Sequence, residues 1–288
     1  MASPKILVIG SSGHQHVKCV DWINIDTVNI VDFDTVVVNT RPLTEDFLKT
    51  CDWRFFDNIR TSLSRLLKSP GEIITFGDKA HYVKISDYTS FSNYCWSPIR
   101  VDTEDECGDT VVIKTPKFPR YFEKLKSWEF YYHFYYYKDG LTDELKKICG
   151  EPGDRYKYHR DVEHFVENRY GKMLAGSIKL NTTHQEDKYS EKSKKILELG
   201  SLTVLPIISG IEPRQAINII LEDILSLPQE ILPPEWVEAV PMPLVEQIQT
   251  IISEKELAIQ AIEVEISGHK IEKAGLEIFK KLLYASGS

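Results

Sequence analysis

A loop of small and imidazole side chains near the N-terminus has the residue types best suited to chemistry. It runs Gly10-Ser11-Ser12-Gly13-His14-Gln15-His16 and follows a short apolar run. Small residues at the end of a strand let backbone N–H groups approach a phosphate closely, so this loop is a candidate nucleotide or phosphate site. The spacing matches neither GxGxxG nor the P-loop pattern, and a Gly/Ser turn without a ligand is the commoner explanation of so loose a motif. The candidate ligand-binding residues are Gly10, Ser11, Ser12, Gly13, His14 and His16.

Metal-binding and nucleophilic chemistry have less support in the sequence. His14 and His16 lie two residues apart and suit two ligands of one metal ion, but a third ligand is needed. Asp78 and His81 are the nearest guess from topology, and two surface histidines explain the pattern more simply, so we expect no metal. No GxSxG or GxCxG frame and no CxxC pair occurs. The sequence therefore identifies no catalytic residue and no cofactor.

A basic and aromatic region lies in the middle of an acidic chain. The net charge of the chain is −8, whereas residues 114–172 hold 13 Lys and Arg against 10 Asp and Glu. Basic groups between aromatic rings can hold phosphates and stack bases, so this region is a candidate nucleic-acid or partner face. Packing of an aromatic strand is the interpretation that we favour. The candidate residues are Lys117, Arg120, Lys124, Lys126, Tyr131 and Tyr135.

The elements that would position the N-terminal loop follow an α/β pattern. Strands are predicted at residues 5–9, 34–39 and 72–77, and the continuous apolar run at 34–39 is typical of a strand buried on both faces of a parallel sheet. An amphipathic helix is predicted at 57–68, and Thr44 is expected to cap an earlier helix. Strand, helix and strand with short joins predict a βαβ unit. The predicted fold is therefore α/β, with a Rossmann-like, mostly parallel sheet.

The middle of the chain departs from this pattern. Residues 82–170 are predicted to be an aromatic, β-rich insertion or flank of a domain spanning 1–210. Residues 181–195 are expected to form a polar loop, and 200–206 a closing strand of the sheet. A helix is predicted at 213–227. It opens a segment of helix and Pro-rich linker over residues 211–243.

The last segment, residues 244–288, carries a heptad pattern. Apolar residues recur at two core positions over several heptads, which predicts a coiled-coil helix, although Lys255, His269 and Lys273 interrupt the seam. We expect the helix to pair with its own copy or a partner protein, and folding back on the α/β domain is the alternative. The predicted self-association residues are Ile248, Ile252, Ile259, Ile262, Ile266, Leu276 and Leu283.

Composition and targeting signals indicate a cytoplasmic protein. The 288 residues contain no apolar run of membrane-spanning length and no signal-peptide core, so no membrane partner is expected. The five cysteines are widely spaced and odd in number, which favours reduced thiols.

Two parts of the chain together resemble a loose group of uncharacterised prokaryotic proteins. The first part comprises residues 34–43 and 66–74, and the second comprises 200–206, Pro233-Pro234-Glu235-Trp236, the heptad helix and residues 279–284. That group has a Rossmann-like N-terminal domain, similar in layout to glutamine-amidotransferase-like folds, followed by a coiled coil. The resemblance implies a role in antiviral defence. The sequence shows no amidotransferase cysteine, and we expect none of the nuclease domain that many members carry, so no catalytic residue is transferred.

Our leading hypothesis from the sequence is a non-catalytic module that binds a ligand or partner and self-associates through its C-terminal helix. One alternative is an enzyme acting on a nucleotide or sugar-nucleotide, with residues 10–16 as its phosphate loop. Another is nucleic-acid binding through residues 114–172.

Overall fold

The chain divides into two units in the computed structural model, Met1–Pro228 and Gln229–Ser288. The predicted coiled coil and its self-association residues lie outside the described residues, apart from Lys255 and Lys273, which are helical and exposed. The structure describes residues 4–14, 17–85, 90–134, 141–149, 156–185 and 194–225, together with these two lysines.

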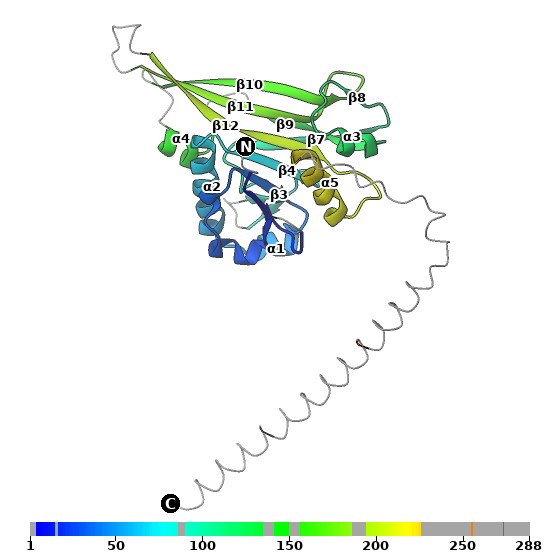
Figure 1. The fold of residues 1–288 in the computed structure, drawn as a ribbon, viewed down its shortest axis with the longest axis horizontal. Coiled ribbons are helices and arrows are strands. Elements are labelled where there is room, and N and C mark those ends of the chain that lie inside the picture. Colours follow the sequence, from blue (N-terminus) through cyan, green and yellow to red (C-terminus); the bar gives the residue numbers. More distant parts are fainter. Residues whose placement is uncertain are drawn as a thin grey trace, which may run out of the picture. The chain divides into compact units, whose positions relative to one another are not determined.

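One eight-stranded, mostly parallel sheet forms the centre of the first unit (Figure 1). Its order is β2-β1-β3-β4-β12-β11-β10-β8, in which β2 to β12 run parallel and the rest antiparallel. The class predicted from the sequence, α/β with a mostly parallel sheet, is confirmed. The strands are β1 (Ile6–Ile9), β2 (Lys18–Val20), β3 (Thr35–Asn39), β4 (Glu72–Gly77), β8 (Val112–Ile113), β10 (Tyr156–Glu167), β11 (Met173–Gln185) and β12 (Lys194–Pro206).

The continuous apolar runs form the buried strands that the sequence predicts. Every residue of β1 and β3 is buried, as in a strand covered on both faces. The Thr44 hydroxyl accepts a hydrogen bond from the Phe47 N–H and caps α1 (Glu45–Thr50). Asp52 caps α2 (Trp53–Lys68), which connects β3 to β4. The predicted βαβ unit is therefore present.

Helices cover both faces of the sheet and enclose two apolar cores. On one face, α2 packs Phe56, Ile59 and Leu63 against alternate residues of the parallel strands. On the other face, α3 (Pro119–Lys124) and α5 (Pro213–Leu225) pack against the remaining residues, and Ile217 and Ile220 are fully buried. Because alternate strand residues point to opposite faces, one short strand contributes to both cores. Since α5 packs in the second core, the first unit extends past residue 210 to Pro228.

The aromatic middle forms a second, two-stranded sheet. The strand β7 (Val101–Gly108) pairs antiparallel with β9 (Trp128–Phe134), and the aromatic side chains of β9 are buried. The short pair β5 (Tyr82–Lys84) and β6 (Ser90–Ser92) precedes them, and α4 (Asp143–Cys149) follows. The aromatic density therefore reflects packing against the main sheet in this part of the chain.

The later strands differ from the expected arrangement in two ways. The predicted polar loop at 181–195 is strand at both of its ends, because β11 continues to Gln185 and pairs with β12 from Lys194 onward, and the residues between these two lie outside the described part. Backbone hydrogen bonds between two long antiparallel neighbours hold polar residues in a ladder that side-chain pattern alone does not reveal. The predicted closing strand is internal, since β12 lies between β4 and β11. None of the described helices is long and apolar enough to cross a membrane.

Candidate functional site

The parallel strands end at one edge of the sheet and present loops there. The chain leaves β1 toward β2 on one side and then crosses to β3 on the other side. This reversal makes the carboxyl ends of β1 and β3 a topological switch point, which is where open α/β sheets bind ligands. The Gly10 loop (residues 10–14) follows β1 at this point. The predicted ligand residues that the structure describes, Gly10 to His14, are therefore at the position that topology favours.

The conformation of the Gly10 loop is fixed by contacts to neighbouring strands and turns. Gly10 has φ +78, and a Cβ there would lie 2.6 Å from both the Asn39 carbonyl oxygen and Trp22 Nε1. Asn39 Nδ2 donates to the Gly10 carbonyl oxygen at 2.9 Å, and Trp22 Nε1 donates to the Asn39 carbonyl oxygen at 3.0 Å. Only glycine fits this turn, because a side chain would meet both strain and a clash.

Three side chains form a hydrogen-bonded chain between the loop and α5 (Pro213–Leu225). His14 is 8% exposed, and its Nε2 lies 2.8 Å from Ser11 Oγ. Its Nδ1 lies 2.7 Å from Oδ1 of Asn218, on α5. An amide oxygen can only accept, so Nδ1 carries the proton of the neutral ring. Nε2 is then the acceptor, and the Ser11 hydroxyl donates to it.

The start of α5 supplies a positive charge to the same loop. A guanidinium nitrogen of Arg214 donates to the Gly13 carbonyl oxygen at 3.0 Å, and the Arg214 side chain is exposed. Gly13 has φ +76, and Ser12 and Gly13 are both exposed. Within the described part of the chain, the N–H groups of Ser12 and Gly13 donate to no other residue. Among the described residues, these two N–H groups therefore have no acceptor, and they lie beside a cation.

A cavity of about 390 Å³ lies farther along the same edge, at the ends of β4 and β12. Its walls include Asp78, His81, Trp128 and Pro206. Asp78 also contacts Arg41 at 3.6 Å, at the end of β3. This volume is within the range of small-molecule sites. Asp78 and His81, which the sequence offered as a third metal ligand, thus line the cavity. His14, the first candidate metal ligand, has both ring nitrogens within hydrogen-bond distance of other side chains, those of Ser11 and Asn218.

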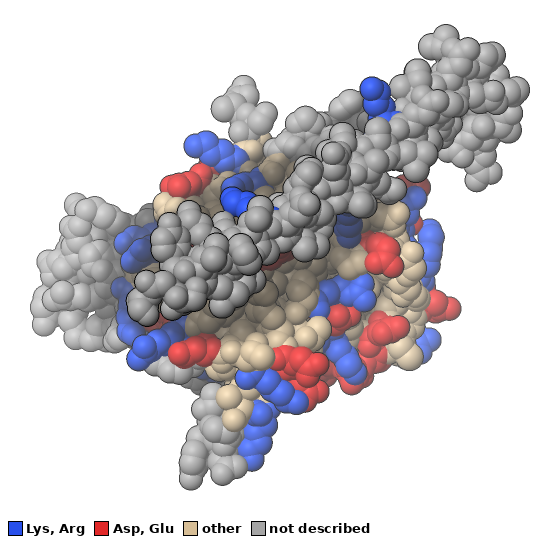
Figure 2. Space-filling model, turned by 90° about the horizontal axis from the view of Figure 1, so that it is seen from below, with Lys and Arg blue, Asp and Glu red and all other residues tan. Residues whose placement is uncertain are grey.

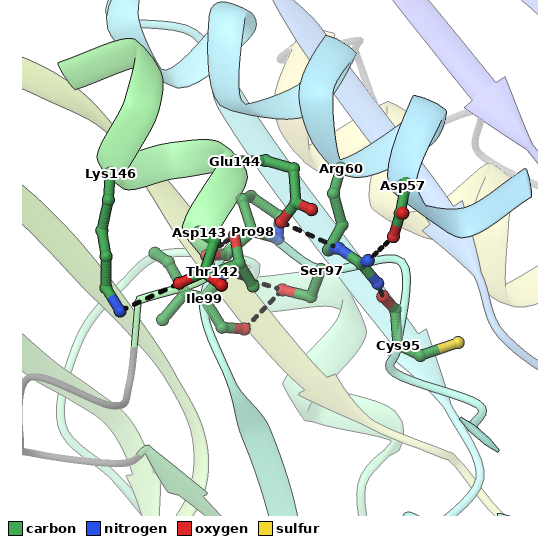
Figure 3. Close-up of polar contacts among 10 residues, drawn as sticks. All are labelled: Asp57, Arg60, Cys95, Ser97, Pro98, Ile99, Thr142, Asp143, Glu144 and Lys146. Carbon is green, nitrogen blue, oxygen red and sulfur yellow. Dashed lines mark hydrogen bonds and ion pairs between the residues drawn. The ribbon is translucent and has the colours of Figure 1, made fainter. Parts of the chain in front are cut away.

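A second polar cluster, around Arg60 of α2, is structural in character (Figure 3). The guanidinium donates to Glu144 of α4 at 3.1 Å and to the Cys95 carbonyl oxygen at 2.6 Å, and it also pairs with Asp57. These partners occupy the guanidinium on several sides. Arg60 therefore ties α4 and the 95–99 segment to α2, and its cation is already neutralised by two carboxylates.

The residues of the predicted basic face take part mainly in ion pairs and packing. Lys117 contacts Glu163 at 2.8 Å, and Arg120 contacts Glu222 at 3.7 Å. Tyr131 is buried and donates to Glu104. Lys124 and Lys126 are exposed. Figure 2 shows Lys and Arg interspersed with Asp and Glu over the face that it displays, rather than gathered in one patch.

The structure brings together some predicted site residues and adds two that sequence reasoning missed. Gly10, Ser11, Ser12, Gly13 and His14 form the loop, whereas His16 and Tyr135 lie outside the described residues. The missed residues are Arg214 and Asn218, one turn apart on α5. Their signal in the sequence is a polar pair at i and i+4 near the start of a helix that follows the last parallel strand.

No family model, curated protein or solved structure matches the chain. The resemblance to defence-associated proteins therefore stays a prediction.

Proposed function

We propose that the first unit is a Rossmann-like domain that binds a small anionic ligand at the Gly10 loop. The supporting observation is the position and shape of this loop: it occupies the β1/β3 switch point in a conformation held by Asn39 and Trp22. The N–H groups of Ser12 and Gly13 point to anion recognition, because they donate to no described residue and lie beside Arg214. A phosphate or carboxylate group suits this environment.

Thermal-shift measurements on the full chain test the proposal. Inorganic phosphate, nucleotides and small dicarboxylates form the panel, and at least one should raise the unfolding temperature in a concentration-dependent manner. Gly13→Glu should abolish the shift, because a carboxylate would fill the anion position. A panel that leaves the unfolding temperature unchanged would contradict the proposal.

Gly171→Glu is a matched control for this substitution. Gly13 and Gly171 have nearly equal backbone φ, +76 and +74, so both variants carry similar strain. A Cβ at Gly171 meets nothing within 4 Å, and this residue lies in the turn between β10 and β11. The Gly171 variant should keep the ligand-dependent shift. If it loses the shift too, the effect of Gly13→Glu is due to strain and not to the site.

A further inference from the structure

We propose that Ser11, His14 and Asn218 form a nucleophile–base–orienting relay that hydrolyses small carboxylic esters bearing a negative charge. The inference rests on the proposed function, because the ester must bind at the same Gly10 loop. It departs from the non-catalytic interpretation of the sequence. It is carried by two short hydrogen bonds, Ser11 Oγ to His14 Nε2 at 2.8 Å and His14 Nδ1 to Asn218 Oδ1 at 2.7 Å.

The direction of these hydrogen bonds is the one that activates a serine. The Asn218 oxygen fixes the proton of the imidazole on Nδ1, so Nε2 presents its lone pair to the Ser11 hydroxyl. A base held in this tautomer by a third group, and within hydrogen-bond reach of a hydroxyl, is the arrangement that nucleophilic catalysis needs. Burial of the His14 ring restricts its rotation, whereas Ser11 remains partly exposed and within reach of a substrate.

Groups beside the relay suit the other requirements of acyl transfer. The N–H groups of Ser12 and Gly13 directly follow the nucleophile and donate to no other described residue, so they can stabilise an oxyanion. The Arg214 guanidinium, held by the Gly13 carbonyl oxygen at 3.0 Å, favours a substrate with a carboxylate or phosphate group. These contacts define the substrate class as a small anionic ester.

The reaction balances without an oxidant or reductant. Ser11 Oγ attacks the ester carbonyl carbon, and its proton passes to His14 Nε2 as the new C–O bond forms. The bond to the alcohol then breaks, and the alcohol leaves with that proton. A water molecule, deprotonated by Nε2, attacks the acyl-serine, which releases the carboxylic acid and restores the Ser11 hydroxyl.

Covalent labelling of the full chain with a fluorophosphonate, followed by peptide mass mapping, tests the nucleophile. We expect one adduct on Ser11, which Ser11→Ala removes. The neighbouring exposed Ser12 is a matched control, and Ser12→Ala should label as the wild type does. His14→Gln should slow labelling by about 100-fold or more, the usual contribution of a general base. Absence of an adduct on Ser11 in the wild-type chain would overturn the proposal.

The positioning role of Asn218 is tested by a pair of substitutions on the exposed side of α5. Asn218→Leu removes the acceptor and should slow labelling of Ser11. Asn218→Asp keeps an oxygen at the same place and should restore the rate to within about tenfold of wild type. A purely structural role would be indicated by equal labelling rates in the two variants at equal unfolding temperatures, and that result would remove Asn218 from the relay.

Hydrolysis of two model esters tests the substrate class. The rate with 4-nitrophenyl hydrogen succinate should exceed that with 4-nitrophenyl acetate, and Arg214→Gln should remove the difference. Equal rates in the wild-type chain would overturn the anionic specificity. The two proposals fail separately. A ligand-dependent thermal shift without a Ser11 adduct supports the binding site and refutes the relay. A Ser11 adduct without a thermal shift by any panel member supports the relay and refutes the binding site.

Discussion

Side chains from two distant parts of the chain meet at the carboxyl edge of the sheet. Ser11 and His14 share one loop, and the sequence singled out that loop by its small residues and its position after an apolar run. Asn218 lies 204 residues away from His14 in the chain. No local pattern links it to the loop, because their contact depends on how α5 packs across the sheet. The sequence therefore predicted the loop residues of the candidate site and missed Asn218 on α5.

At this scale, Glu72 gives a prediction for the dependence of stability on pH. Burial raises the pKa of this carboxyl above its usual value, while the Lys117 charge and a hydrogen bond from Thr203 oppose the shift. Its contribution to stability is thus present at low pH and is lost as pH rises through the raised pKa. Glu72→Gln should therefore increase the free energy of unfolding at pH 7 and change it little at about pH 4.

Urea unfolding at the two pH values measures this difference. Glu123→Gln is the control, because Glu123 is an exposed carboxylate on α3. It should alter stability equally little at both pH values. A Glu72→Gln variant less stable than the wild type at pH 7 would contradict the prediction.

The cysteines should differ widely in their reaction with thiol reagents. Burial raises the pKa of the Cys95 thiol to about 12, and it also raises the pKa of Cys149. Cys107 is exposed. Because the thiolate is the reactive species, Cys107 should react first with Ellman's reagent at pH 8, and the half-buried Cys95 much more slowly. Peptide mapping identifies the modified site, and modification of Cys95 as fast as that of Cys107 in the native chain would contradict its raised pKa.

At the scale of elements, the strands that are buried on both faces were the ones that the sequence revealed. β1, β3 and β4 consist largely of apolar residues, and this pattern needs no knowledge of their neighbours. β7 and β10 were missed because acidic and basic residues interrupt them. Their stability comes from antiparallel partners far along the chain, such as β9 and β11, which a local window does not include.

The Arg60 cluster predicts how α4 is held in place. The Arg60 side chain is 18% exposed. Arg60→Ala would leave the partly buried carboxylates of Asp57 and Glu144 without their cation. We expect the free energy of unfolding to fall by about 2–3 kcal/mol. Arg65→Ala, on an exposed position of the same helix, should change it by less than about 0.5 kcal/mol. Urea denaturation compares the two, and equal effects would show that the cluster adds nothing specific.

At the scale of the whole molecule, the chain combines an α/β unit with a second unit of different sequence character. The first unit ends at Pro228, where prolines become frequent, and the heptad pattern follows in the second. Self-association through this pattern remains a prediction from the sequence. Its apolar stripe is longer than a single tethered helix usually buries alone.

Light scattering coupled to size exclusion tests that prediction. The full chain should be a dimer or a larger oligomer, and a chain shortened to end at Pro241 should be a monomer with an unchanged thermal transition. The paired substitution Ile259→Asp and Ile262→Asp in the full chain should also give the monomer, because a charge at each core position opposes packing. Monomers in all three cases would refute self-association.

The ring nitrogen of His14 that carries the proton decides whether this side chain can activate Ser11. Nitrogen-15 NMR of the labelled full chain, with the His14 signals assigned by comparison with His14→Gln, reports which ring nitrogen is protonated. Because Asn218 Oδ1 accepts from the ring, the predicted tautomer of the neutral His14 ring carries its proton on Nδ1 and leaves Nε2 unprotonated, and the Nε2 shift should change in Ser11→Ala. A neutral ring protonated on Nε2 would contradict the account, because that nitrogen would then donate to Ser11 and could not remove its proton.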